Sequence, residues 1–149
     1  MEATGMKQFI PVLICFLLCG SVISYAQHNY WKDLARVAIE EKTDESGFPV
    51  EFPVFHDNLK AIEGDKIMLE GYMVPLEEMM GHKYFVLSKY PFNMCFFCGA
   101  AGPETVIEVY TTEEVDFTSD KIKIQGTLEL NEDDPRHLMY LLQNAEVVD

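Results

Sequence analysis

Residues 121–130 constrain the fold more than any other segment, because their side chains alternate between polar and apolar on either side of Gly126. A period of two is the pattern of a β-strand that turns one face toward a core. A glycine in the middle of such a strand is typical of a bend or bulge, as at the corner of a barrel. The segment therefore predicts a long, bent strand in a mainly β protein.

Other short segments complete this pattern. Apolar or β-branched runs bounded by turn residues predict strands at 36–42, 67–74, 84–87 and 105–110, and a segment with two prolines, 49–53, predicts an edge strand or extended connection. Residues 57–62 predict one helical turn that Gly64 ends. The C-terminal stretch fits a helix at Leu138, Leu141 and Leu142 and also alternates as a strand. We expect a closing strand, because a barrel needs a last partner for residues 121–130.

The first 26 residues have the organisation of a secretion signal. Lys7 supplies a basic start, residues 9–22 are apolar, and Ser24-Tyr25-Ala26 is a small-x-small cleavage site. An apolar run of about fifteen residues is shorter than the ~20 of a membrane-spanning helix. Residues 1–26 are therefore predicted to be a cleaved signal peptide, which places the mature protein in the periplasm or outside the cell without stable membrane insertion. Lipidation at Cys15 or Cys19 is the less favoured alternative.

Residues 27–149 are predicted to form a single domain, since no linker, repeat or low-complexity stretch divides them. The chain has 25 acidic and 11 basic residues and a net charge of −14, which loss of the signal leaves unchanged. Such a field repels nucleic acid and anionic lipid. We expect no nucleic-acid partner.

Cys95 and Cys98 form a C-x-x-C pair and are the thiols that remain after signal cleavage. A thioredoxin-like site needs a sustained helix after the first cysteine, and Gly99, Gly102 and Pro103 disfavour one. Covalent haem attachment needs histidine where Gly99 stands. Three interpretations stay open: a disulfide that closes a tight loop, two thiolate ligands of a metal site, and a pair of buried, inert thiols, which an oxidising compartment disfavours.

A metal site needs further ligands. His82 is the first candidate for a third ligand, and two thiolates with an imidazole suit zinc. Cu(I) is the alternative metal, because thioethers bind it together with thiolates and four methionines lie in nearby segments. The methionines are Met73, Met79, Met80 and Met94, and less easily placed ligands are His56, Glu104 and His137.

Four strings carry a family resemblance: residues 71–76 (GYMVPL), 85–91 (FVLSKYP), 95–99 (CFFCG) followed by a GPE at 102–104, and 126–131 (GTLELN). Over residues 31–147 the chain resembles a family of exported bacterial proteins classed as a domain of unknown function. The resemblance implies an OB-like barrel, closed or partly open, with one or two short helices. It also implies a location in the cell envelope and a link to the handling of metals, zinc above all.

The sequence shows none of the common catalytic motifs, such as a nucleophile elbow, a zinc-protease helix or a phosphate-binding glycine loop. We therefore expect a non-catalytic protein of the envelope that binds a metal ion through Cys95, Cys98 and His82. The alternative is an adaptor stapled by a Cys95–Cys98 disulfide, which binds a protein or glycan partner. Its binding surface would use exposed aromatic residues, with Tyr30, Trp31, Phe92 and Phe97 as candidates.

Overall fold

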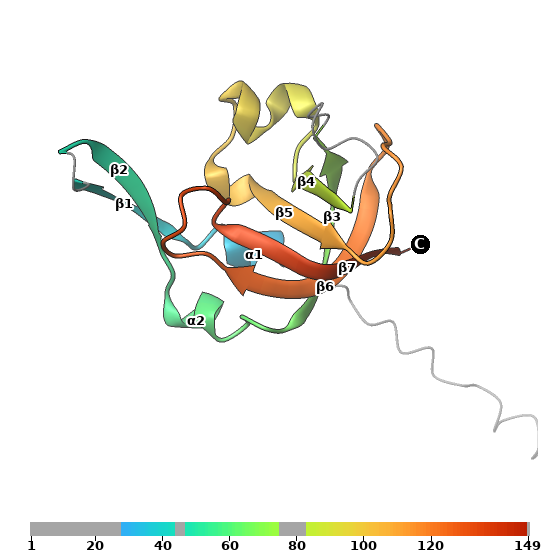
Figure 1. Cartoon of the computed structure of the whole chain (residues 1–149), viewed down its shortest axis with the longest axis horizontal. Coiled ribbons are helices and arrows are strands. Elements are labelled where there is room, and N and C mark those ends of the chain that lie inside the picture. The colour runs from blue at the N-terminus through green and yellow to red at the C-terminus, as the bar shows by residue number, and fades with distance from the viewer. Residues whose placement is uncertain (1–27, 44–46, 75–82, 149) are drawn as a thin grey trace, which may run out of the picture.

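A closed barrel of five strands forms the body of the protein (Figure 1). The computed structural model describes residues 28–43, 47–74 and 83–148. The barrel strands are β3 (Lys66–Met73), β4 (Tyr84–Ser88), β5 (Val106–Thr111), β6 (Ile122–Leu130) and β7 (Tyr140–Val148). They follow the order β3-β4-β5-β7-β6, with β5 and β7 parallel and the other pairs antiparallel. The predicted mainly β, OB-like barrel is confirmed, in its closed form.

The alternation of side chains along the strands fills the barrel. Ile67 and Leu69 of β3 and Ile124 and Leu128 of β6 are buried in one core cluster. In β6 the pairing with β7 shifts register between Gln125 and Thr127, on either side of Gly126. Of the bend or bulge predicted at this glycine, the structure shows an irregularity of the pairing typical of a bulge. A Cβ at this position would lie 2.8 Å from Leu142 Cγ, so the close approach of β7 also requires glycine.

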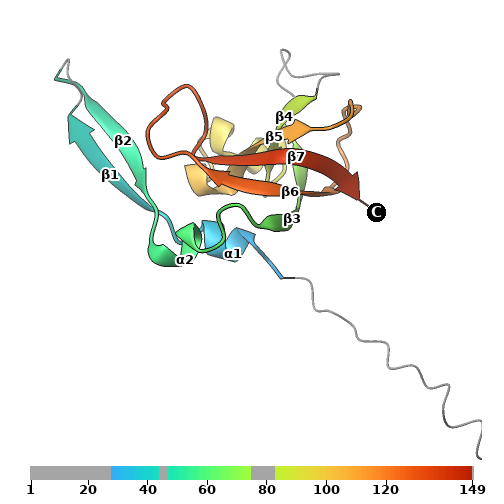
Figure 2. The ribbon, with the colours of Figure 1, turned by 60° about the horizontal axis from the view of Figure 1, so that its bottom comes forward.

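A separate two-stranded sheet projects from one side of the barrel (Figures 1 and 2). It consists of β1 (Ala38–Thr43) and β2 (Pro49–Val54), which pair antiparallel. The predicted strand at 36–42 is thus present, and the proline-containing segment is its partner. Pro49 and Pro53 cannot donate hydrogen bonds, which suits a strand at the edge of a sheet.

Two four-residue helices lie beneath the barrel (Figure 2), α1 (Trp31–Leu34) and α2 (Asp57–Lys60). The sequence predicted α2 but not α1. The expectation that Trp31 is exposed was wrong: the residue is 5% exposed, packs in the main core, and donates a hydrogen bond from Nε1 to the Glu70 carbonyl over 2.8 Å. None of the helices in the described ranges is long and apolar enough to cross a membrane.

Three 3₁₀ turns connect β4 to β5 and form a lobe at one end of the barrel (Figure 1): η2 (Phe92–Met94), η3 (Phe96–Cys98) and η4 (Pro103–Thr105). This lobe contains the C-x-x-C pair. The segment predicted to be a signal peptide lies outside the described residues, as do His82, Met79 and Met80, so the predictions about them stay predictions.

Candidate functional site

The C-x-x-C pair occupies a tight turn within the 3₁₀ lobe. The amides of Cys98 and Ala100 both donate to the Cys95 carbonyl, over 3.2 and 3.4 Å, and Gly99 N donates to Phe96 O over 2.8 Å. Gly99 has a φ of 74°, a left-handed conformation in which glycine carries no steric penalty. The glycine that disfavoured a long helix in the sequence therefore closes this turn, and η3 extends over three residues only.

The two thiols differ in their surroundings. Cys95 is fully buried, whereas Cys98 is exposed and its Sγ donates a hydrogen bond to the Phe92 carbonyl over 3.0 Å. Both are free thiols. Desolvation raises the pKa of the Cys98 thiol, and the neighbouring Cys95 thiol raises it further. The turn thus brings the two sulfurs together, with one of them open to solvent.

Among the described residues, the structure does not bring the other predicted ligands into one shell with these thiols; His82 lies outside that part of the chain. Within the described residues, no group of three or more His, Cys, Asp and Glu side chains is arranged to hold a metal ion. Lys83, which follows His82 in the sequence, is at the end of β4 away from the lobe, and donates from Nζ to Thr112 O. At ~3.3 Å per residue, β4 separates Lys83 from Ser88, where the lobe begins, by roughly 17 Å. Glu104 is in the lobe itself, with its carboxylate folded against Gly102.

A buried carboxylate on the outer face of β5 is a feature that the sequence analysis missed. Glu108 is 3% exposed and accepts three hydrogen bonds: from Leu138 N over 2.6 Å, from Tyr110 Oη over 2.7 Å, and from His137 Nδ1 over 3.0 Å. It therefore ties residues 131–139, the connection between β6 and β7, to the barrel wall. The available signal was a single charged residue in a strand whose other residues are all β-branched or aromatic.

A groove of about 320 Å³ lies beside the lobe, between the β1–β2 sheet and the β6–β7 connection. Ile39 and Phe52 line it on one side, and Phe96 and Leu138 on the other. Phe96 and Leu138 also pack against a second small apolar cluster, formed by Val74, Val86 and Val106. Because Phe96 stands between the two cysteines, the C-x-x-C turn and the groove share a wall.

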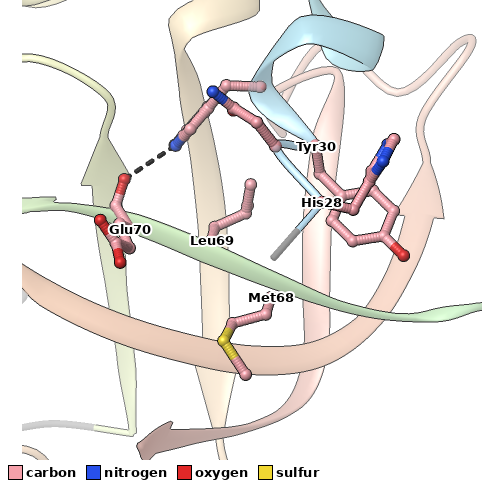
Figure 3. A pocket seen from close by; sticks show the side chains of 7 residues that line it. His28, Tyr30, Met68, Leu69 and Glu70 are labelled. Atoms are coloured by element: carbon pink, nitrogen blue, oxygen red, sulfur yellow. Dashed lines mark hydrogen bonds between the residues drawn. The ribbon is translucent and has the colours of Figure 1, made fainter. Parts of the chain in front are cut away.

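A smaller hollow of about 190 Å³ lies at the start of the described chain (Figure 3). The rings of His28 and Tyr30 meet edge to face there, with centroids 4.6 Å apart, and Leu69 and Glu70 of β3 form the opposite side. The His28 ring is itself bonded to Asp33. The Glu70 carboxylate is likewise paired with Lys121, so the polar side chains of His28 and Glu70 already have partners and this hollow offers less for a ligand than the groove does.

No family model matches the chain, and no curated protein matches it. A solved structure is similar. It is that of a DUF3299 family protein from Pseudomonas aeruginosa PAO1, with 19% sequence identity and a TM-score of 0.45. The similar region covers 60% of this chain and 65% of that one, so the chain spans less than two thirds of the length of the protein it resembles. The family resemblance inferred from the sequence strings stays a prediction.

Glu108 also affects the tyrosines around it. Burial, with a contribution from Glu108, raises the pKa of Tyr84 to about 12. Burial followed by the hydrogen bond to Glu108 raises the pKa of Tyr110, and burial raises that of Tyr140, whose Oη donates to Leu34 O over 2.7 Å. In each case the protein favours the neutral phenol, because its burial or its carboxylate neighbour opposes a second negative charge.

We expect these three tyrosines to ionise above pH 10 in the folded protein, and the fold to weaken in the same range. Their folded pKa values lie above the unfolded value of 10.0, so their contribution to stability is complete below pH 10. It is lost as the pH rises through the folded values, about 12 for Tyr84. Absorbance of tyrosinate at 295 nm, followed together with circular dichroism, measures both effects, and Tyr84→Phe should remove one late-titrating group. Ionisation of every tyrosine near pH 10 before unfolding would contradict the expectation.

Proposed function

We propose that this chain is an exported, non-catalytic protein that binds a thiophilic metal ion through Cys95 and Cys98. Zinc is the preferred ion and Cu(I) the alternative. The observation that supports the proposal is the turn that holds the two thiols side by side, with Cys95 buried and Cys98 exposed. A metal ion needs a fixed donor pair together with a path of entry, and this arrangement offers both.

The protonation state of the thiols makes the proposed binding dependent on pH. A metal binds the thiolate, and the raised pKa of Cys98 means that its free thiol keeps its proton at neutral pH. Binding would therefore release protons and weaken as the solution becomes more acidic.

Three residues are candidates for the third ligand of the proposed metal ion. His82 remains the first choice from the sequence. Glu104 is closer in the chain and belongs to the lobe. Imidazole and carboxylate both suit zinc, whereas Cu(I) would favour a thioether such as that of Met94 in η2.

Elemental analysis and intact mass of the mature protein test this proposal, provided that it is purified without metal-affinity resins. We expect about one zinc ion per chain, with both thiols reduced. Cys95→Ser and Cys98→Ser should each lose the metal. Met94→Leu, which alters an exposed neighbour on the same lobe, should retain zinc and lose only Cu(I) binding. His82→Ala and Glu104→Gln identify the third ligand, because only one of them should weaken binding.

The second candidate function is that of an adaptor stapled by a Cys95–Cys98 disulfide, which binds a protein or glycan partner. The exposed rings of Phe92 and Phe97 on the same lobe support it, since they offer apolar surface for a partner. A mass two hydrogens lighter than the reduced chain, without metal, would favour this function over metal binding. Reduction should then lower stability by about 2 kcal/mol, as expected for so short a loop.

A further inference from the structure

We infer that the groove beside the 3₁₀ lobe is a docking site for a peptide segment of a partner protein, one that carries an apolar side chain next to basic ones. This inference is independent of the proposed metal site. It rests on the lining of the groove, on the charges at its rim and on the rigidity of its floor.

The lining of the groove is apolar and accessible. Ile39 is 38% exposed, and Phe52, Phe96 and Leu138 are partly exposed. Pro53 and Pro103 add further apolar surface. A volume of about 320 Å³ suits one or two aliphatic side chains, and their burial here would be favourable by about 25 cal/mol per Å² of apolar area.

The rim of the groove is acidic. Glu51 of β2 and Asp133 of the β6–β7 connection are exposed, and neither has an ion-pair partner within the described residues. Glu132 and Asp134 beside them are paired with Lys60 and Arg136. Unpaired carboxylates on a chain of net charge −14 attract cations and repel anions, so the complementary segment is basic.

The floor of the groove is held in place before any partner arrives. Asn131 Nδ2 donates to the carbonyls of Asp134, over 2.8 Å, and Leu138, over 3.1 Å, while Glu108 accepts from Leu138 N. Phe96 and Leu138 rest on the valine cluster of the barrel wall. A preformed site loses little conformational freedom on binding, which favours affinity.

The outer face of β4 and β5, the second and third strands of the barrel, is where OB-type barrels bind their ligands, together with the loop between the last two strands. Here the β6–β7 connection covers part of that face and leaves the groove beside it. Binding of nucleic acid is disfavoured by the acidic rim. Strand addition to β2 is disfavoured as well, because Pro49 and Pro53 cannot donate. The apolar lining therefore favours recognition through side chains.

A titration of the mature ¹⁵N-labelled protein with three short peptides, followed by NMR, tests the inference. The peptides contain two leucines flanked by lysines, two leucines flanked by glutamates, and two serines flanked by lysines. We expect saturable shifts at Ile39, Phe52, Phe96 and Leu138 with the first peptide. The other two should bind at least tenfold more weakly. Binding of the first peptide should weaken as salt rises, because the rim charges are exposed.

Variants separate the groove from the rest of the surface. Ile39→Asn should weaken binding at least tenfold, whereas Val147→Asn, at an exposed β-branched residue of β7, should leave it unchanged. Glu51→Lys should weaken binding, and Glu146→Lys on β7 should have little effect. The inference is overturned if the lysine–leucine peptide causes no shifts or shifts spread over the barrel. It is also overturned if the glutamate-flanked leucine peptide binds as tightly as the lysine-flanked one.

Discussion

Gly71→Ala is expected to destabilise the protein by about 2 to 3 kcal/mol, the upper range for overpacking a buried site. A Cβ at this position would lie 2.5 Å from Ser88 O and 2.9 Å from Leu87 Cγ. The first of these atoms belongs to the backbone of β4, so it can move only if β3 and β4 separate. These strands pair over a short stretch, at Tyr72 with Ser88 and at Met73 with Leu87. The strain would therefore fall on the shortest strand pairing of the barrel, that of β3 with β4.

Urea denaturation measures the change in the free energy of unfolding. In thermal denaturation, the melting temperature should fall by roughly 10 °C. Gly102→Ala is the matched control. A Cβ there also meets a close neighbour, but that neighbour is the carboxylate of Glu104, at the end of a flexible side chain that can turn away. We expect Gly102→Ala to cost less than about 1 kcal/mol. Equal stability of the two variants would mean that β4 yields without cost at Ser88.

The strands could be predicted from sequence because their signal is local. Alternation within β6 and the β-branched residues of β5 are properties of neighbouring positions. The C-terminal stretch shows where local information ends: its leucines fit both a helix and a strand, and pairing with β6 and β5 decides for the strand. Barrel closure was the argument that favoured a strand, and it proved to be correct.

Helix α1 and the position of Trp31 were missed for the opposite reason. Four residues are too few to show a helical period, and nothing near Trp31 in the sequence indicates that its ring will be buried. The partners of the indole, Glu70 and the main core, are contributed by β3 and other distant elements. Burial of an aromatic ring is a tertiary property, which composition alone does not give.

The candidate site also has a part that could be predicted from the sequence and a part that could not. The C-x-x-C pair could be found from its spacing, and the tight turn that Gly99 closes agrees with the prediction that no long helix follows. The groove could not be found, because it is formed by residues from β1, β2, η3 and the β6–β7 connection. Glu108 gave a signal that can be used in other chains. A single acidic residue buried among β-branched and aromatic residues of a strand needs hydrogen-bond donors, and those donors mark where another segment packs.

Glu108→Ala is expected to destabilise the protein by about 3 kcal/mol. The carboxylate accepts three hydrogen bonds. Its removal leaves the part-buried Leu138 N without its acceptor and takes away the shortest hydrogen bond of the Tyr110 hydroxyl. Lost packing at a site that is 3% exposed adds to this cost. Urea denaturation measures the loss, and Glu146→Ala, at an exposed glutamate of β7, is the control, with an expected change below about 0.5 kcal/mol.

Local hydrogen exchange separates this effect from a general loss of packing. If Glu108 fixes the β6–β7 connection, Glu108→Ala should accelerate hydrogen exchange of the Leu138 amide much more than that of the β3 amides. Strand β3 is paired with neither β5 nor β7, so it serves as the reference. Glu108→Gln should retain most of the protection, because its amide oxygen can still accept from Leu138 N. Uniform acceleration of exchange across the barrel would instead show that the carboxylate supports the whole fold, and that the floor of the groove does not depend on it in particular.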